Sequence, residues 1–220
     1  MVLVQNDRIP RPQQVIDQLR VTESAQPLSW DDHLANMLSQ IASPPVLSVL
    51  MAGLCATRLT RAVVWPWVVI HVGLTVALPL AFLVWLLARG LVSDLDVQHR
   101  EERIWPMLMA LGGAAASLII LRLAATPRLL FGISLATFFQ LLLILAITLH
   151  WKISVHTTAV GSFAALMHNL AGASVLPLVG LILLVAWARI HLKRHTLAQT
   201  MAGALLGSLT MLIVLMFVRS

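Results

Sequence analysis

The chain has 220 residues, of which 59% are hydrophobic and 11% are charged. Soluble domains average about 25% charged residues, so this composition excludes a water-soluble monomer and indicates an integral membrane protein. The formal net charge of +6 does not indicate nucleic-acid binding, because the basic residues lie singly between apolar runs and form no patch. A single cysteine, Cys55, excludes a disulfide framework and a cysteine metal site within one chain.

Residues 1–40 are predicted to form a polar tail, which holds five of the nine acidic residues. The run from Ser29 to Asp32 has the composition of a helix start, so we expect the tail to be partly helical and otherwise disordered. Its first residues lack the basic start and apolar core of a secretory signal peptide. The transmembrane helices are therefore expected to direct membrane insertion themselves.

Residues 41–220 are predicted to form an all-α, polytopic transmembrane bundle of six or seven spans. A helix needs about 20 apolar residues to cross the hydrocarbon core of a bilayer. The candidate stretches are 41–57, 62–88, 104–122, 128–149, 156–172, 174–188 and 196–218. Short segments that carry nearly all remaining charges separate them.

Three of the seven candidate spans are weaker than the others. The first begins at Pro44, the fifth contains His168, and the sixth is interrupted by Pro177. A packed bundle is still expected, because neighbouring helices satisfy backbone groups that a helix breaker frees. In the last span Gly203 and Gly207 form a GxxxG pair, which allows close contact with another helix.

Seven spans would place the connecting segments alternately on two faces of the membrane. We define face A as the side of the tail and of segments 89–103, 150–155 and 189–195, and face B as the opposite side. All nine acidic residues fall on face A. Face B carries no acid and five arginines: Arg58, Arg61, Arg122, Arg128 and Arg219.

Three segments of face A supply ionisable groups that could converge, because two helices separate each segment from the next. The groups are Asp94, Asp96, His99, Arg100 and Arg103; Lys152, Ser154 and His156; and Arg189, His191, Lys193, Arg194 and His195. Guanidinium groups bind phosphate oxygens bidentately, and imidazole serves as nucleophile or acid near neutral pH. This set of groups predicts a phosphate site that requires no metal and no other cofactor.

Two of these segments resemble motifs of the type 2 phosphatidic acid phosphatase superfamily, which shares its catalytic core with vanadium haloperoxidases. The family's third motif is Ser-Arg, five residues, His, three residues, Asp. This chain has Ala188-Arg189, five residues, His195, three residues, Gln199. The family's second motif, Pro-Ser-Gly-His, corresponds here to the four residues 153–156, which keep the serine and the histidine.

The segment before them resembles the first motif of that family, which is Lys, six residues, Arg-Pro. Arg103 matches the arginine, Asp96 stands where the lysine would be, and the proline is delayed to Pro106. Arg100 or Lys152 could supply the absent cation, or Asp96 could pair with a basic residue and position it. The resemblance covers residues 94–207 and keeps the family's order of motifs.

The resemblance implies a metal-independent phosphohistidine mechanism, with His195 as nucleophile and His156 as general acid. It implies three phosphate ligands: Arg103, Arg189 and the Ser154 hydroxyl. Gln199 would accept a hydrogen bond from the imidazole of His195 without supplying the charge of the family's acid.

The resemblance implies hydrolysis of a lipid phosphate or a polyprenyl diphosphate at a cell membrane, with membrane lipids as partners. A non-catalytic membrane protein that keeps the fold for lipid binding or helix association is the alternative. Gln199 and the absent lysine favour this alternative.

His71 and His168 lie outside the set of face A groups and are predicted to be hydrogen-bonded structural residues.

Basic residues mark the cytoplasmic side of a membrane protein. Once the arginines assigned to the site are discounted, this rule places face A outside the cytoplasm.

Overall fold

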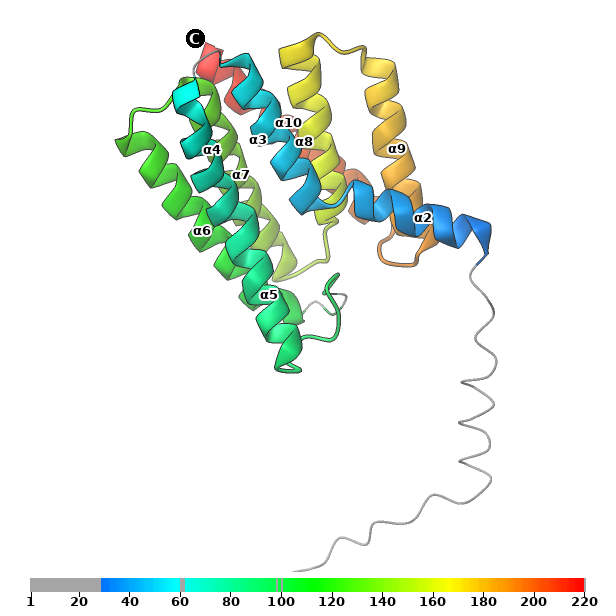
Figure 1. Cartoon of the computed structure of the whole chain (residues 1–220). Coiled ribbons are helices and arrows are strands. Elements are labelled where there is room, and N and C mark those ends of the chain that lie inside the picture. Colours follow the sequence, from blue (N-terminus) through cyan, green and yellow to red (C-terminus); the bar gives the residue numbers. More distant parts are fainter. Residues whose placement is uncertain (1–28, 60–61, 98, 100, 220) are drawn as a thin grey trace, which may run out of the picture.

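The computed structural model describes residues 29–59, 62–97, 99 and 101–219. Figure 1 shows this part of the chain as a bundle of helices with no strand, which confirms the all-α fold. The α-helices are α2 (Trp30–Ile41), α3 (Pro44–Arg58), α4 (Trp65–Val72), α5 (Leu78–Ala88), α6 (Ile104–Leu123), α7 (Arg128–Thr148), α8 (Val155–Ala171), α9 (Val175–His191) and α10 (Leu197–Arg219). Shorter helical turns are η1 (Ala62–Val64), η2 (Gly73–Ala77) and η3 (Glu101–Arg103).

All seven predicted stretches are helical, and most are long enough to cross a membrane. Four stretches of the described chain meet the requirements of length and composition: Trp65–Ala88, Glu101–Leu123, Arg128–Thr148 and Leu197–Val218. The pair α2 and α3, bent by 44°, raises the number to five if it counts as one span. These helices fit a multi-pass membrane protein. The larger number of six or seven spans depends on α8 and α9, each of 17 residues, and stays a prediction.

The prolines in the weaker stretches lie where a helix tolerates them. Pro44 is the first residue of α3, and Pro177 lies in the first turn of α9. The first N–H groups of a helix have no acceptor within it, so a proline there removes no hydrogen bond. Both helices can therefore form despite these residues.

The two histidines predicted to be structural are both hydrogen-bonded. His71 is buried, and its Nδ1 lies 2.9 Å from the hydroxyl of Ser117 on α6. Nδ1 of His168 lies 3.0 Å from the carbonyl oxygen of Ala173. The hydrogen bonds predicted for both residues are therefore present.

Helices α8 and α10 pack with almost no space between their backbones. A Cβ atom at Gly207 would overlap the carbonyl oxygen of Thr158, and one at Gly203 would overlap that of Ser154. On the other helix, a Cβ atom at Gly161 would overlap the carbonyl oxygen of Ala204. The predicted GxxxG contact of the last span is therefore present, and its partner is α8.

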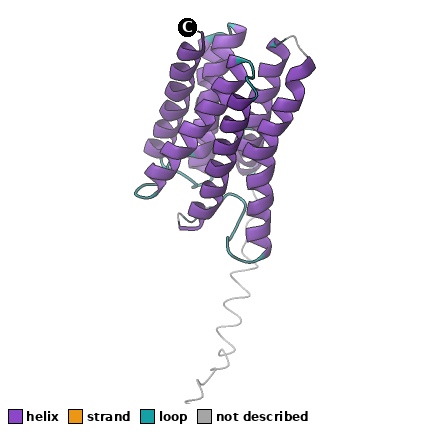
Figure 2. Ribbon diagram, turned by 90° about the vertical axis from the view of Figure 1, so that its left-hand side faces the viewer, coloured by secondary structure: helices purple, strands orange, loops and turns teal. Residues whose placement is uncertain are grey.

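The two ends of the bundle carry the segments predicted for the two faces. Figure 1 shows the C-terminus and the α6–α7 and α8–α9 connections at one end, and the α5–α6, α7–α8 and α9–α10 connections at the other. Figure 2 shows the long helices running side by side between these ends. The connecting segments of face A thus lie on one surface, as the alternation predicts.

Helix α2 belongs to the region predicted as a polar tail, and it packs against α9. The Ser29 side chain accepts a hydrogen bond from the N–H of Asp32, and the Asp32 carboxylate accepts one from the N–H of Ser29. This reciprocal pair is a capping box and confirms the predicted helix start. The part of the predicted tail before Ser29 lies outside the described residues.

Enlarging Gly207 is expected to separate α8 from α10. Gly207→Ala should lower stability in detergent by about 1–3 kcal/mol, because the new methyl group overlaps the backbone of Thr158. The matched control is Gly180→Ala on α9, where a Cβ atom meets nothing within 4 Å. Alanine there should be neutral or slightly stabilising. Thermal unfolding measures both variants, and equal melting temperatures would contradict the packing described.

Candidate active site

The end of α9 places His195 against Arg189. The helix ends at His191, and Lys193 takes a left-handed φ of 53°. This turn folds the chain back, so that the N–H groups of Arg194 and His195 both donate to the carbonyl oxygen of Arg189, at 3.0 and 3.2 Å. Backbone hydrogen bonds therefore fix the spacing between the arginine and the histidine of this segment.

Gln199 fixes the proton position on the His195 imidazole. The Gln199 side-chain oxygen lies 3.0 Å from Nδ1 of His195 and 3.2 Å from the backbone nitrogen of Thr196. A backbone N–H can only donate, so the oxygen of Gln199 must be the acceptor and Nδ1 of His195 must carry a proton. The hydrogen bond predicted for Gln199 is present. Neutral His195 then has its lone pair on Nε2, the nitrogen available as a nucleophile.

The surroundings of His195 keep its imidazole neutral. The side chain is 7% exposed. Burial lowers the pKa of His195 from 6.5 to about 3. The hydrogen bond that His195 donates to Gln199 opposes this shift, and the positive charges of Arg103 and Arg189 add to it. At neutral pH the imidazole is therefore uncharged, which is the state that a nucleophile requires.

The start of α8 lies next to the start of α10. The N–H of Ser154 donates to the carbonyl oxygen of Gln199 at 3.3 Å. The Ser154 side chain is fully buried, and its hydroxyl caps α8 by accepting from the N–H of Thr157 at 3.4 Å. The cavity described below is lined by Val155 and His156 and not by Ser154. The structure therefore does not bring the Ser154 hydroxyl to the site, although it places the N-terminus of α8 there.

Arg103 ties the α5–α6 connection to the start of α8. Its side chain is buried, with Nε donating to the carbonyl oxygen of Val97 at 2.7 Å and Nη1 to that of Ile153 at 3.4 Å. A buried guanidinium must be hydrogen-bonded to offset its loss of hydration. The two carbonyl groups accept these hydrogen bonds, so Arg103 links the α5–α6 connection to the α7–α8 connection.

Arg189 is buried and only partly hydrogen-bonded. It is 2% exposed, and its Nη1 donates to the Ser39 hydroxyl at 2.6 Å and to Oδ2 of Asp96 at 3.2 Å. Its Nε is buried without a hydrogen-bond partner among the described residues. An unsatisfied buried donor is costly. Arg189, which lines the cavity described below, therefore keeps one donor without an acceptor in the described part of the chain.

Asp96 pairs with basic residues, as one of the sequence-based alternatives predicts. Oδ2 of Asp96 lies 3.2 Å from Nη1 of Arg189 and 3.8 Å from Nε of Arg194. Burial alone would raise the pKa of Asp96, but the positive charge of Arg189 and a smaller effect of His156 hold it below its ordinary value. Asp96 is thus a carboxylate at neutral pH.

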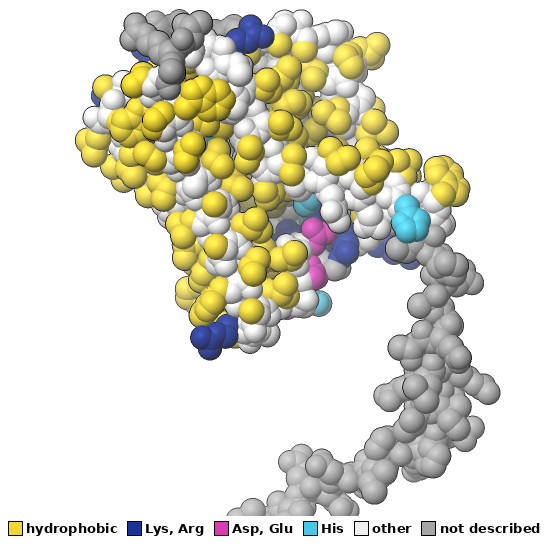
Figure 3. All heavy atoms as spheres, viewed as in Figure 1, with side chains coloured by type: hydrophobic (Ala, Val, Ile, Leu, Met, Phe, Trp, Pro, Cys, Tyr) yellow, Lys and Arg dark blue, Asp and Glu magenta, His cyan; other side chains and the backbone are white. Residues whose placement is uncertain are grey.

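One cavity of about 710 Å³ brings these groups together. The charged residues and histidines that line it are Asp94, Asp96, Arg103, His156, Arg189, Arg194 and His195, and the polar residues Asn36, Ser39, Gln40 and Ser43 line it as well. Its apolar wall includes Pro44, Val46, Leu80, Leu83, Pro106 and Met107. Figure 3 shows acidic, basic and histidine side chains gathered in a hollow of an otherwise hydrophobic surface. The two predicted catalytic imidazoles therefore lie on one face and line one cavity.

Of the two cations predicted to replace the missing lysine, Lys152 is described by the structure and Arg100 is not. Lys152 does not line the cavity, yet it lies within electrostatic range of it. Burial, followed by the charges of Arg103 and Arg189, lowers the pKa of its ammonium group. Arg100 lies outside the described residues.

Ser39 is a site residue that sequence reasoning missed. It lies on α2, is 5% exposed and accepts from Arg189, which is 150 residues away in the chain. The helix start at Ser29 can be predicted from sequence, but no local pattern shows that α2 packs on α9. Only the fold brings Ser39 to the cavity.

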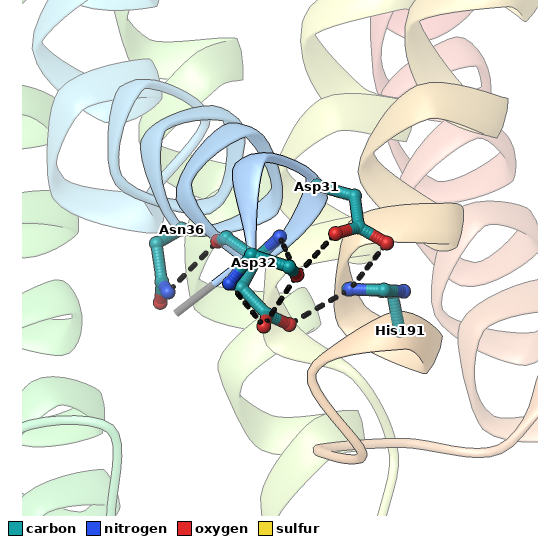
Figure 4. Close-up of polar contacts among 5 residues, drawn as sticks. Asp31, Asp32, Asn36 and His191 are labelled. Atoms are coloured by element: carbon teal, nitrogen blue, oxygen red, sulfur yellow. Dashed lines mark hydrogen bonds and ion pairs between the residues drawn. The ribbon is translucent and has the colours of Figure 1, made fainter. Parts of the chain in front are cut away.

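A second polar cluster also fastens α2 to α9. Figure 4 shows His191 facing Asp31 and Asp32, and its Nε2 lies 3.7 Å and 2.9 Å from their carboxylate oxygens. Nδ2 of Asn36 donates to the backbone carbonyl of Asp32 at 2.9 Å. His191 therefore belongs to this helix contact and does not line the cavity.

Comparison with known proteins identifies no relative of this chain, so its function is inferred from the cavity. No family model, curated protein or solved structure matches the chain. The described chain is all-helical, with four to five spans long and apolar enough to cross a membrane, and the cavity combines buried cations, two imidazoles and an apolar wall.

The lowered pKa of His195 predicts a loss of stability in acid. The unfolded chain protonates His195 below about pH 6.5, whereas the folded protein does so only near pH 3. Stability should therefore fall between these values, by up to about 1.4 kcal/mol per pH unit. Melting temperatures from pH 7.5 downward measure the effect. His195→Gln should show a smaller decrease, whereas His168→Gln, at an exposed histidine, should behave like the wild type. Equal decreases in wild type and His195→Gln would refute the assignment.

Proposed function

We propose that this protein is a metal-independent membrane phosphatase that hydrolyses a lipid phosphate or a polyprenyl diphosphate through a phosphohistidine. On this proposal it is a divergent member of the type 2 phosphatidic acid phosphatase superfamily, with six or seven spans. The observation that carries the proposal is that His156, His195, Arg103 and Arg189 line one cavity although they come from three distant segments. The order of these residues in the chain matches that family's motifs.

The first chemical step is attack by Nε2 of His195 on phosphorus. A nitrogen–phosphorus bond forms, and the bond from phosphorus to the leaving oxygen breaks. The leaving oxygen takes a proton from the imidazolium of His156. That charged form is favoured when a phosphate dianion is bound beside it. Arg103, Arg189 and the N-terminus of α8 stabilise the negative charge on the phosphoryl oxygens.

The second step releases phosphate. Neutral His156 takes a proton from a water molecule as that water attacks the phosphohistidine, and the nitrogen–phosphorus bond breaks. Inorganic phosphate leaves, and His195 returns to its neutral state with Nδ1–H donating to Gln199, 3.0 Å away. The amide stabilises the charged phosphoimidazole less than a carboxylate would. We expect turnover to be slower than with an acid at this position.

The apolar wall of the cavity supports a lipid substrate. Leu80, Leu83 and Met107 line the same cavity as the arginines. A phosphate group can therefore bind the cations while its acyl or prenyl chain lies against these side chains and reaches the bilayer between helices. Ordinary apolar residues do not distinguish a phosphatidate from phosphatidylglycerol phosphate or a polyprenyl diphosphate.

Two observations favour the alternative of a non-catalytic membrane protein with this fold. Gln199 supplies no charge to the nucleophile, and Asp96 occupies the position of the motif lysine while pairing with Arg189. Such a protein would bind lipid or pack against other helices without turnover. The absence of hydrolysis with every substrate in the assay below would favour it.

Metal-free phosphate release tests the enzyme. Purified protein in detergent with EDTA should release phosphate from at least one of a panel of lipid phosphates, and vanadate should block the release. His195→Ala should lower the rate by at least about a thousandfold, because the nucleophile is lost. His168→Ala, a matched histidine at the other end of α8, should retain full activity.

A second variant separates the two histidine roles. His156→Gln should lose hydrolysis of alkyl phosphates, whose alkoxide needs a proton, and retain more activity on p-nitrophenyl phosphate, whose leaving group is a stable anion. Unchanged release by His195→Ala would exclude the nucleophile assigned here. Equal losses on both substrates would exclude His156 as the general acid.

The charge distribution supports a site on the extracytoplasmic side of the membrane, which we propose is the plasma membrane. Face B carries Arg58, Arg122 and Arg128 without a catalytic use, as expected for cytoplasmic loops. Lys193 and Ala125 are exposed turn residues on opposite faces and can be tested as single cysteines. In intact cells, Lys193→Cys should react with a membrane-impermeant maleimide and Ala125→Cys should not. The reverse pattern would place the site in the cytoplasm.

A further inference from the structure

The carboxylate of Asp96 lies where an anionic ligand would meet Arg189. One oxygen, Oδ2, contacts Nη1 of Arg189 at 3.2 Å and lies 3.8 Å from Nε of Arg194. Two guanidinium groups thus converge on a single carboxylate oxygen at the wall of the cavity. This is the arrangement in which arginines hold a phosphate oxygen.

The pairing with Asp96 leaves one hydrogen-bond donor of Arg189 without an acceptor. Its Nη1 serves both Ser39 and Asp96, while its buried Nε has no partner in the described part of the chain. A carboxylate with one oxygen engaged cannot give the two parallel hydrogen bonds that a guanidinium forms with phosphate. A phosphate group could bind Nε as well and would satisfy Arg189 better than Asp96 does.

The position of Asp96 in a partly exposed connection allows its side chain to move away from Arg189. It lies in the connection between α5 and η3, and its side chain is 36% exposed, against 2% for Arg189. The next residue, Val97, has a φ of 45°, which is unfavourable for a β-branched residue. The groups that act on the Asp96 charge are Arg189, His156 and Arg194. Arg189 and Arg194 would face a bound phosphate equally well.

We propose that Asp96 is an internal anion that occupies the Arg189 part of the phosphate site in the unliganded protein, and that a bound phosphate displaces its carboxylate. This inference rests on the proposed function for the identity of the ligand, but it concerns binding and not turnover. Asp96 is then a residue that sets the affinity of the site. It keeps Arg189 paired when the site is empty and weakens the binding of any anion that must take its place.

Isothermal titration of inorganic phosphate into the purified protein, at neutral pH and low salt, tests the inference. Asp96→Asn keeps a hydrogen-bond acceptor for Arg189 and removes the competing charge, so it should bind phosphate about tenfold more tightly or better. The control Glu102→Gln removes a charge from the same connection, where Glu102 accepts hydrogen bonds from Ser93. Its affinity should stay within about twofold of the wild type, as expected for a charge outside the site.

Further variants locate the binding and guard against misfolding. Arg189→Gln should abolish the gain of Asp96→Asn when the two are combined, because the competition is for Arg189. If Asp96→Asn does not unfold cooperatively, Asp96→Ser replaces it in the phosphate titration. Weaker or unchanged phosphate binding in both Asp96 variants would overturn the inference, as would a gain that survives Arg189→Gln. Tighter binding without hydrolysis of any lipid phosphate would reject the proposed enzyme and leave the role of Asp96 standing.

Discussion

The close contact between α8 and α10 determines where the candidate site can form. Lipid chains are as apolar as leucine side chains, so helices in a membrane associate through close packing and interhelical hydrogen bonds. Glycines at the crossing bring the two backbones together, and the Gln140 side chain of α7 donates to Ser162 on α8 and to Thr210 on α10, each at 2.8 Å. This packing sets the start of α8 beside the start of α10. The positions of His156 and His195 follow from it.

Burial of two guanidinium groups is the second constraint. A buried cation is stable only when it is hydrogen-bonded or paired. Arg103 uses the carbonyl groups of Val97 and Ile153, and Arg189 uses Ser39 and Asp96. These partners lie in the α5–α6 connection, the α7–α8 connection and α2. The requirements of the arginines therefore draw three otherwise separate segments over the cavity, which explains why a polar hollow exists in a surface of lipid-facing side chains.

Sequence predicts what depends on local spacing and misses what depends on distant packing. The apolar runs predict the helices, GxxxG predicts a close contact, and the motif resemblance implies a hydrogen bond between His195 and Gln199; all are present. The motif resemblance, and not local spacing, assigns Ser154 to phosphate, and in the structure its hydroxyl caps α8. Ser39 carries no local signal, since its partner Arg189 lies 150 residues away. Long-range contacts of this kind depend on the complete packing of the bundle.

Gln199 and Asp96 depart from the motifs that the chain resembles, and both affect the charge of the cavity. An acid at position 199 would stabilise a charged imidazole and would also repel an incoming phosphate. Gln199 fixes the same tautomer without that repulsion; on the proposed chemistry, it would give up part of the stabilisation of a phosphohistidine. Asp96 introduces negative charge only where Arg189 and Arg194 neutralise it, on a connection and not on a helix. On the proposed chemistry, such a site keeps its arginines paired when empty and presents its full positive potential once the carboxylate has moved away.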